Sequence, residues 1–341
     1  MDLQSALRRV TERQDLTAEE MAEVMRTIMT GGATPAQIGG FLVGLRMKGE
    51  TVAEIAAAAG VMRELAEQMQ ADDVTSLVDT CGTGGDASGT LNVSTAAAFV
   101  AAAGGASVAK HGNRSVSGRS GSADLLEAAG ARLELSSEAV AECLRRTGVG
   151  FLFAPAHHSA MRHAVGPRKE MGVRTLFNIL GPLTNPAGAQ RQLLGVYAPE
   201  WVRPVAEVLR ELGSRHVLAV HAEDGLDEIS IAAPTRIAEL RDGEVQEYTV
   251  TPAELGLRGA PLHEVTVAGA SDSLAMIRAA FAGERIAAAE LIAANAGAAL
   301  YVAGRAESLP AGIEQARELM GSGAVAARVD RFVAVTQELA Q

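Results

Sequence analysis

The sequence predicts an α/β protein with a small all-helical N-terminal domain and a larger α/β domain, in which helices flank a mostly parallel central sheet. Two observations carry this prediction. The first 70 residues place apolar side chains at helical spacing and show no strand pattern. From Val74 onward, short β-rich runs alternate with helical windows, and this βαβ rhythm is typical of a parallel sheet covered by helices.

Three helices are predicted in the N-terminal part from their capping signals. Thr17-Ala-Glu-Glu20 is a capping box that precedes an apolar-periodic run. Thr34, followed by proline, begins a second helix that ends at Gly49. Thr51-Val-Ala-Glu54 begins a third helix, which is expected to reach about Gln70.

Strands and helices then alternate along the middle of the chain. Each predicted strand is a short run rich in β-formers, and each predicted helix shows apolar positions three or four residues apart. Residues 174–186 are expected to form a helix and a proline-punctuated turn. The strands are expected at 76–80, 106–110, 132–135, 150–153, 192–197 and 216–221, and the helices at 94–103, 122–129, 137–147 and 200–212.

The last third of the chain adds a hairpin and long helices. Arg241-Asp-Gly-Glu244 is a hairpin turn between the β-rich runs 236–240 and 245–250. Two Ala-rich helical windows follow, near 286–303 and 311–341.

Composition and charge exclude several classes of protein. The 341 residues include 30 Lys and Arg against 41 Asp and Glu, a formal net charge of −11, and only 3% are aromatic, which disfavours a general nucleic-acid binder. The longest apolar run, 96–106, is too short to span a bilayer, and the N-terminus does not resemble an export signal. Two cysteines, Cys81 and Cys143, cannot form a disulfide framework. A cytoplasmic protein is expected.

The acidic residues avoid two long stretches of the chain. Residues 87–123 contain no Asp or Glu across 37 positions, although the overall composition predicts about four. Residues 143–199 contain one acid, Glu170, together with seven Lys or Arg. Because the protein is negatively charged overall, a region without acidic side chains is suited to bind an anionic ligand. Buried Ala-rich helices are the alternative explanation, since they also lack acidic residues.

A glycine-rich segment follows the first predicted strand. In Asp79-Thr-Cys-Gly-Thr-Gly-Gly-Asp86, the residues Gly82, Gly84 and Gly85 permit positive φ, so successive N–H groups can face one concavity and hold a phosphate. The segment is neither a P-loop nor a GxGxxG fingerprint, and an ordinary tight turn is the alternative. Asn92-Val-Ser-Thr95 then begins an Ala-rich helix, whose start suits a phosphate monoester as well as an ordinary helix cap.

A second polar segment, Lys110-His-Gly-Asn-Arg-Ser-Val-Ser117, gathers a cation, an imidazole, an amide and hydroxyl groups after a predicted strand. Core packing explains this set poorly. Lys110 is suited to bind phosphate as a point charge, and His111 and Asn113 are suited to orient an aromatic acid or a hydroxyl group. Ser122 lies at the start of the next expected helix.

Acids return at His221-Ala-Glu-Asp-Gly-Leu-Asp-Glu228, after another predicted strand. Open α/β sheets bind ligands at the ends of strands, and Mg²⁺ takes one or two carboxylates plus substrate phosphates and water. A magnesium site is one interpretation of this segment, and a solvated acidic turn is the other. Arg168, in the second acid-poor stretch, can hold a carboxylate through two hydrogen bonds, unless it is an ordinary surface arginine.

Taken in order, these segments closely resemble one family, the anthranilate phosphoribosyltransferases of tryptophan biosynthesis. The resemblance covers essentially the whole chain, and several motifs in the right order are more specific than any one of them. The matching segments are Thr34-Pro-Ala-Gln-Ile, Gly82-Thr-Gly-Gly-Asp86, Asn92-Val-Ser-Thr95, Lys110-His-Gly-Asn-Arg-Ser-Val-Ser117, Gly121-Ser-Ala-Asp124, Arg174-Thr-Leu-Phe-Asn-Ile-Leu-Gly-Pro-Leu-Thr-Asn-Pro186 and Asp224-Gly-Leu-Asp-Glu228.

The resemblance implies transfer of phosphoribose from 5-phosphoribosyl 1-diphosphate (PRPP) to the amine of anthranilate, with release of pyrophosphate and with Mg²⁺ as cofactor. It implies a helical domain, residues 1–72 completed by mid-chain helices near 165–187, and an α/β domain, residues 73–164 and 188–341. The active site is expected at the hinge between the domains. The helical domain is expected to form a homodimer, and no nucleic-acid or membrane partner is implied.

The resemblance also implies roles for single residues. The chain departs from the usual family pattern at His157-His-Ser-Ala-Met161 and Gly166-Pro-Arg168, both on the anthranilate side. PRPP is expected to bind at Gly82, Thr83, Gly84, Gly85, Asp86, Thr90, Asn92, Ser94, Thr95, Lys110 and Ser122. Anthranilate is expected to bind at Gly82, His111, Asn113, His158, Arg168 and Gly181, and Mg²⁺ at Ser94, Asp227 and Glu228.

Two other functions are alternatives. One is a nucleoside phosphorylase of the same fold. Such enzymes have a sequence similar to Lys-His-Ser-Thr-Gly-Gly at the first loop, where this chain has Thr80-Cys-Gly-Thr-Gly-Gly-Asp86, and they lack the acid pair that this chain has at Asp227-Glu228. A non-catalytic, nucleic-acid-binding relative loses the pyrophosphate loop and tends to be basic. This chain keeps the glycine-rich loop and is acidic, so its sequence favours the transferase over both alternatives.

Overall fold

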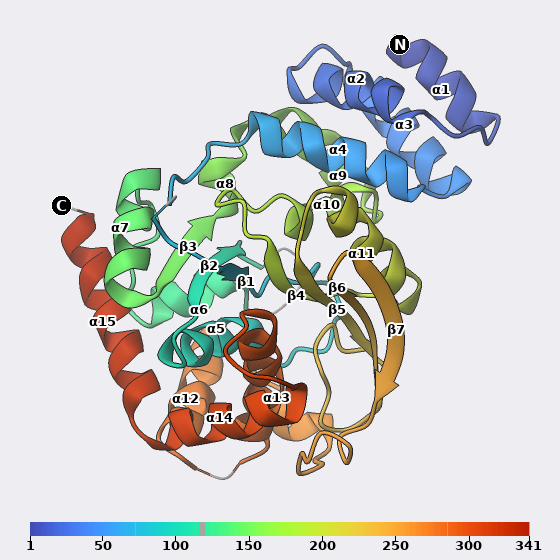
Figure 1. Cartoon of the computed structure of the whole chain (residues 1–341). Coiled ribbons are helices and arrows are strands. Elements are labelled where there is room, and N and C mark those ends of the chain that lie inside the picture. The colour runs from blue at the N-terminus through green and yellow to red at the C-terminus, as the bar shows by residue number, and fades with distance from the viewer. Residues whose placement is uncertain (72, 116–119, 285, 341) are drawn as a thin grey trace.

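The computed structural model describes residues 1–71, 73–115, 120–284 and 286–340. Four N-terminal helices lie together at one end of the molecule (Figure 1). Capping boxes are present at Thr17, Thr34 and Thr51, so local sequence sets the start of three of these helices. The four are α1 (Leu3–Thr11), α2 (Ala18–Met29), α3 (Pro35–Lys48) and α4 (Val52–Leu65).

Helix α4 ends at Leu65, short of its predicted end. Beyond it, the N–H of Glu67 donates to the carbonyl of His157 at 2.8 Å, and the N–H of Met69 donates to the carbonyl of Pro186 at 3.1 Å. These two bonds replace those that a further helical turn would make. Tertiary contacts therefore set the end of this helix.

One seven-stranded sheet forms the centre of the α/β part, in the order β3-β2-β1-β4-β5-β6-β7. Strands β1 to β5 pair in parallel, and β6 and β7 add antiparallel strands at one edge. The chain builds outward from β1 to β3 and then returns to the other side of β1, so the strand order reverses between β1 and β4. The strands are β1 (Leu77–Asp79), β2 (Ser107–Gly112), β3 (Val149–Phe153), β4 (Arg191–Gly195), β5 (His216–Ala222), β6 (Thr235–Arg241) and β7 (Glu244–Val250).

The predicted hairpin between β6 and β7 is confirmed, and its turn residues Asp242 and Gly243 have φ values of 53° and 83°. The predicted strand at 132–135 is wrong, because this segment is not part of the sheet. The N–H of Arg132 donates instead to the hydroxyl of Thr336 at 3.1 Å. The segment therefore lies against the last helix of the chain.

Helices pack against both faces of the sheet (Figure 1). The predicted window at 311–341 is two helices rather than one, because Gly323 adopts a φ of 79° at the break. No helix within the described ranges is long and apolar enough to cross a membrane. The helices are α5 (Val93–Ala103), α6 (Ser122–Ala128), α7 (Ser137–Thr147), α8 (Ala154–His157), α9 (Arg162–Met171), α10 (Phe177–Leu180), α11 (Val202–Glu211), α12 (Ala270–Phe281), α13 (Ala287–Val302), α14 (Leu309–Gly321) and α15 (Ala324–Leu339).

The two larger hydrophobic cores among the described residues lie on opposite faces of the sheet. Leu193 and Leu218 belong to the core that contains α5 and α13. Successive side chains of a strand point to opposite faces, and accordingly Leu194 and Val217 belong to the core of the N-terminal helices. That second core also contains side chains of α9, α10 and α11. We call α1–α4 together with α9 and α10 the helical part.

Candidate active site

The glycine-rich segment at 82–86, here called the 82–86 loop, follows the carboxyl end of β1, where the strand order reverses. Gly84 and Gly85 have φ values of 63° and 81°, as predicted for a loop that turns its N–H groups inward. Gly82 does not use a positive φ. A Cβ at Gly82 would instead lie 3.2 Å from both the carbonyl oxygen of Gly195 and Oδ2 of Asp227. The loop therefore packs closely against the end of β4 and the acidic segment.

Hydrogen bonds hold the 82–86 loop from two sides. The N–H of Thr83 donates to the carbonyl of Gly195 at 2.8 Å, and Oγ1 of Thr83 accepts from the N–H of Tyr197 at 3.0 Å. The guanidinium of Arg174 donates to the carbonyl of Gly85. These three partners of the loop were not predicted as site residues, and their only signal was position, at the end of a predicted strand or inside a segment that matches the family.

Three predicted acidic residues lie near one another beside this loop. Burial, and then the charge of Asp86, raises the pKa of Asp227. Burial, and then the charge of Asp227, raises the pKa of Glu228. Lys110 and the backbone N–H of Ser94 act in the opposite direction on Glu228. Such a concentration of negative charge favours a cation.

This donor set fits Mg²⁺. Carboxylates and a hydroxyl are hard oxygen ligands, and Mg²⁺ keeps several positions for water and substrate phosphates. Ser94, the third predicted ligand, lies next to Glu228 through its backbone N–H. Within the described ranges, no group of three or more His, Cys, Asp and Glu side chains forms a ready-made metal site. A site built from two carboxylates and completed by substrate oxygens agrees with both observations.

Lys110 connects the ends of β1 and β2 to the start of α5. The side chain is only 3% exposed, and its Nζ donates to the carbonyl of Thr80 at 3.0 Å and to Oγ of Ser94 at 3.2 Å. A buried ammonium group needs compensating negative charge. Asp79 and Glu228 lie near enough to interact with it, since the charge of Lys110 opposes the effect of burial on the pKa of both carboxyl groups.

The predicted PRPP residues near the start of α5 differ in their surroundings. The side chain of Asn92 donates to the carbonyl of Ser120 at 3.1 Å, so it joins the helix start to the segment after β2. The hydroxyl of Thr95 is buried and has no hydrogen-bond partner among the described residues. Thr90 forms an isolated bridge with Thr266. These residues cluster around the helix start, with Asn92 already engaged in internal bonds.

The segment after β2 folds back on itself. The carbonyl of Asn113 accepts from the N–H of Ala123 at 3.2 Å and from Oγ of Ser122 at 3.3 Å. Two predicted site residues, Asn113 and Ser122, are therefore neighbours. Ser117, the last residue of the motif that begins at Lys110, lies outside the described residues.

Three predicted anthranilate residues lie together at the end of β2. The rings of His111 and His158 have centroids 5.1 Å apart. Burial, and then the charge of His158 and His157, lowers the pKa of His111 to about 3, and burial followed by His157 lowers that of His158 to about 4. Neither ring nitrogen of His111 has a hydrogen-bond partner of normal geometry among the described residues. The backbone carbonyl of Gly181 lies close enough to raise the pKa of His111 slightly, against the larger effect of burial. Both imidazoles are therefore neutral at pH 7.

Arg168 lies on α9, and its guanidinium carbon is 5.1 Å from the centroid of the Phe177 ring. Burial lowers the pKa of this arginine, and no acid in the described part of the chain offsets the effect. A half-buried arginine over an aromatic ring suits an anionic ligand. Among the described residues, no hydrogen bond or ring contact joins Arg168 to His111 or Asn113.

Asp79 and Asn185 form a buried support that sequence reasoning did not assign to the site. Oδ1 of Asp79 accepts from the N–H of His111 at 3.1 Å, and Oδ2 accepts from Nδ2 of Asn185 at 2.7 Å. Burial raises the pKa of Asp79 to about 6. The pair joins the end of β1 both to β2 and to the segment that contains Gly181. In the sequence, Asp79 only begins the glycine-rich segment, and Asn185 only lies within one of the matching motifs.

Family comparisons cover both parts of the chain. Residues 74–326 match the α/β domain of the glycosyl transferase family, and residues 4–66 match its helical bundle domain. The chain is 78% identical to an anthranilate phosphoribosyltransferase of Halorhodospira halophila, over 100% of both chains. It is 67% identical to one of Alkalilimnicola ehrlichii, over 99% of this chain and 100% of that one.

Solved structures share the same fold. The crystal structure of anthranilate phosphoribosyltransferase from Thermus thermophilus is 46% identical, with a TM-score of 0.91 over 97% of this chain and 99% of that one. A Saccharomyces cerevisiae anthranilate phosphoribosyltransferase in complex with PRPP and Mg is 24% identical, with a TM-score of 0.88 over 98% of each chain. These relatives support the transferase and neither of the two alternatives. The chain therefore belongs to the glycosyl transferase family and, within it, to the anthranilate phosphoribosyltransferases.

Proposed function

We propose that the enzyme binds PRPP at the 82–86 loop and transfers its 5-phosphoribosyl group to the amine of anthranilate, with Mg²⁺ held by Ser94, Asp227 and Glu228. One observation carries this assignment of the site. The acids lie beside Lys110 and the start of α5, at the point where the strand order reverses. A buried cation and paired carboxylates around one loop suit a polyphosphate that arrives with a divalent cation.

On the PRPP side, the chain supplies N–H groups and one buried cation. The N–H groups of the 82–86 loop and of the first turn of α5 are suited to bind phosphate oxygens. Lys110 offers its charge to the departing pyrophosphate from a position fixed by Thr80 and Ser94. Mg²⁺, when bound, neutralises negative charge on that leaving group. The chain thus positions the substrate and stabilises the charge that develops when the glycosidic bond breaks.

On the anthranilate side, the nucleophile needs no general base, because an aromatic amine is neutral at pH 7. The low pKa values of His111 and His158 keep both rings neutral. A neutral ring nitrogen can accept a hydrogen bond from the amine and orient its lone pair. Arg168 would bind the carboxylate with its planar guanidinium.

A domain movement would complete the anthranilate site, since among the described residues no hydrogen bond or ring contact joins Arg168 to the histidines. We propose that residues 1–72 and 165–187 move as one unit against residues 73–164 and 188–341. Closure would bring Arg168 towards His111 and exclude the water that hydrolyses PRPP. Small-angle X-ray scattering with and without both substrates tests this movement, and an unchanged radius of gyration would contradict it.

The activity is tested by the loss of anthranilate fluorescence when PRPP and Mg²⁺ are added. The double variant Asp227→Asn, Glu228→Gln should lose most turnover and change its Mg²⁺ dependence, whereas Asp330→Asn, at an exposed carboxylate of α15, should not. Arg168→Ala should raise the KM for anthranilate more than that for PRPP. No turnover of anthranilate, together with phosphorolysis of a nucleoside, would contradict the proposal.

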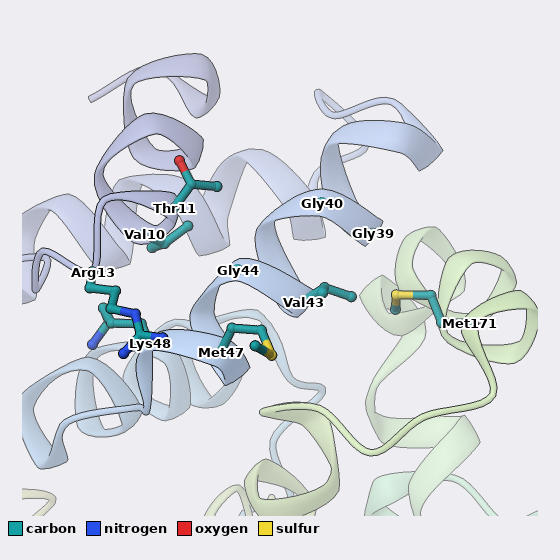
Figure 2. A pocket seen from close by; sticks show the side chains of 10 residues that line it. All are labelled: Val10, Thr11, Arg13, Gly39, Gly40, Val43, Gly44, Met47, Lys48 and Met171. Atoms are coloured by element: carbon teal, nitrogen blue, oxygen red, sulfur yellow. The ribbon is translucent and has the colours of Figure 1, made fainter.

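The helical part also presents apolar side chains to solvent. Figure 2 shows a hollow lined by α1, α3 and α9, with Val43 and Met47 on α3 and Met171 on α9. Val43 and Met47 are 41% and 67% exposed, and Val165 and Val173 of the neighbouring segment are 51% and 48% exposed. Large apolar side chains grouped at a surface mark protein interfaces. This grouping supports a homodimer in which a second copy covers the same face.

Light scattering tests the dimer. The double variant Val43→Lys, Met47→Glu should be monomeric at concentrations where the wild-type chain is dimeric, because a closed dimer buries each of these side chains twice. Exposed Arg203→Glu on α11 is a control that should leave the mass unchanged. A wild-type chain that is monomeric would contradict the proposed interface.

The cysteines support a cytoplasmic location. Cys81 and Cys143 are both free thiols. Burial raises the pKa of each, so both stay protonated and unreactive at pH 7. Proteins of oxidising compartments commonly contain disulfides. Cell fractionation tests the location, and recovery of the enzyme outside the cytoplasmic fraction would contradict it.

A further inference from the structure

Arg174 lies between α9 and α10 and contacts both the helical part and the 82–86 loop. Its guanidinium donates to the carbonyl of Gly85 and stacks on Tyr197, with 4.0 Å between the guanidinium carbon and the ring centroid. Its own carbonyl accepts from the guanidinium of Arg46, on α3. A single residue therefore connects α3 to the loop at which PRPP is proposed to bind.

The contact falls on the part of the loop with the greatest backbone freedom. Gly84 and Gly85 both have positive φ, and glycine adopts many other conformations at little cost. A peptide unit is planar and trans, so its carbonyl and the following N–H point in opposite directions. Because Arg174 holds the carbonyl of Gly85, it also turns the N–H of Asp86 away from itself and thereby fixes the orientation of that donor.

Tyr197 completes the arrangement. Its ring supports the guanidinium of Arg174, and its N–H donates to Oγ1 of Thr83 at 3.0 Å. The two residues hold the loop at two points, Thr83 and Gly85. Stacking on an aromatic ring restricts a long arginine side chain, so less conformational entropy is lost when its hydrogen bond forms.

We propose that Arg174 is a positioning residue for PRPP. It fixes the peptide between Gly85 and Asp86 in the orientation that receives the substrate, and it ties the loop to the helical part through Arg46. It acts through the loop and does not touch the reacting atoms. This inference rests on the proposed function, because it takes the 82–86 loop as the PRPP site.

The test compares Arg174→Ala with the wild-type enzyme in the fluorescence assay, with each substrate varied in turn. We expect the KM for PRPP to rise about tenfold, which corresponds to roughly 1.4 kcal/mol, and the KM for anthranilate to stay within about twofold. Added guanidinium should restore part of the affinity for PRPP, because it can occupy the vacated place on Tyr197. Arg203→Ala, at an exposed arginine of α11, is the matched control and should behave like the wild type.

A second variant tests the link to the helical part. Arg46→Ala leaves the side chain of Arg174 in place, so it should raise the KM for PRPP by a smaller factor. An unchanged KM in this variant would overturn the link to α3. If Arg174→Ala melts well below the wild type, then Arg174→Lys, which keeps the charge but loses the planar stacking, should show the same pattern to a lesser extent.

Three results would overturn the positioning role. The first is a KM for PRPP of Arg174→Ala within about twofold of the wild type. The second is an increase that is confined to the KM for anthranilate. The third is a loss of kcat at unchanged KM, which would make Arg174 a catalytic residue. Failure of the proposed function looks different, because the wild-type enzyme itself would then show no turnover of PRPP with anthranilate.

Discussion

Gly195, the last residue of β4, is a position where one added methyl group should disturb the site directly. A Cβ built there lies 1.5 Å from the carbonyl oxygen of Asp227 and 2.6 Å from its carbonyl carbon. Both are backbone atoms, so no change of side-chain rotamer can relieve the contact. The variant Gly195→Ala must therefore displace β4 or the backbone of Asp227.

The size of the effect follows from this distance. Ordinary contacts of a Cβ begin at 3.4 Å, so the separation from the carbonyl oxygen must more than double. A displacement of about 1 Å at a reacting group can reduce turnover about 100-fold. We expect kcat/KM to fall by at least this factor, about 100-fold, and the Mg²⁺ concentration for half-maximal activity to rise. Overpacking should also lower the free energy of unfolding by about 1–3 kcal/mol.

The assay is the loss of anthranilate fluorescence during a Mg²⁺ titration, with urea unfolding measured on the same samples. Gly60→Ala in α4 is the matched control, because nothing lies within 4 Å of its Cβ position. It should leave kcat/KM unchanged and stabilise the helix by about 0.5–1 kcal/mol. A wild-type kcat/KM in Gly195→Ala would refute the close approach and the placement of Asp227 that depends on it.

Three further predictions concern stability, each measured by urea unfolding. Asp79→Asn should lower the free energy of unfolding by about 1–3 kcal/mol. Asp79 accepts hydrogen bonds from the N–H of His111 and from Nδ2 of Asn185, so the new amide group must face one of these donors. An unchanged free energy of unfolding would contradict this network. Lys48→Met should cost about 3–5 kcal/mol, because it leaves the fully buried Glu54 without its cation, and a loss below about 1 kcal/mol would contradict this. Burial lowers the pKa of His158 to about 4 in the fold, whereas the unfolded chain protonates this ring near 6.5. The contribution of His158 to the free energy of unfolding is therefore complete above pH 6.5 and is lost as the pH falls towards 4. His158→Asn should therefore lose less stability than the wild type across that window, and equal losses would show that the ring is not held neutral.

Much of the secondary structure could be predicted because its signals are local. Thr17 begins a helix because its hydroxyl and the carboxylate of Glu20 satisfy the free N–H groups at the first turn. The end of α4 could not be predicted in this way, since Glu67 donates to the carbonyl of His157, far along the chain. Residues 132–135 alternate between buried and exposed side chains as a strand does, but the surface that covers them is helix α15.

The residues of the site also divide into those that a local motif marks and those that only the fold brings together. Lys110 was predicted from its chemistry, and the structure places it beside Ser94. By contrast, Asp79 and Asn185 are 106 residues apart in sequence, and no local pattern marks such a pair in one chain. The part that each residue takes in binding substrate stays a prediction until the variants are measured.

The composition of the second hydrophobic core has a consequence for biosynthesis of the chain. The N-terminal helices share this core with side chains that the ribosome adds much later, among them Val217 and Leu240 of β5 and β6. About 175 residues separate the end of α4 from Leu240, and at about 5–20 residues per second they take roughly 9–35 s to synthesise. The helices α1–α4 can pack against one another during that interval, but their shared core still lacks the side chains of β5 and β6. The core of the region made first is thus completed only after β6 has been synthesised, and a chaperone has this interval in which to act on the exposed part of that core.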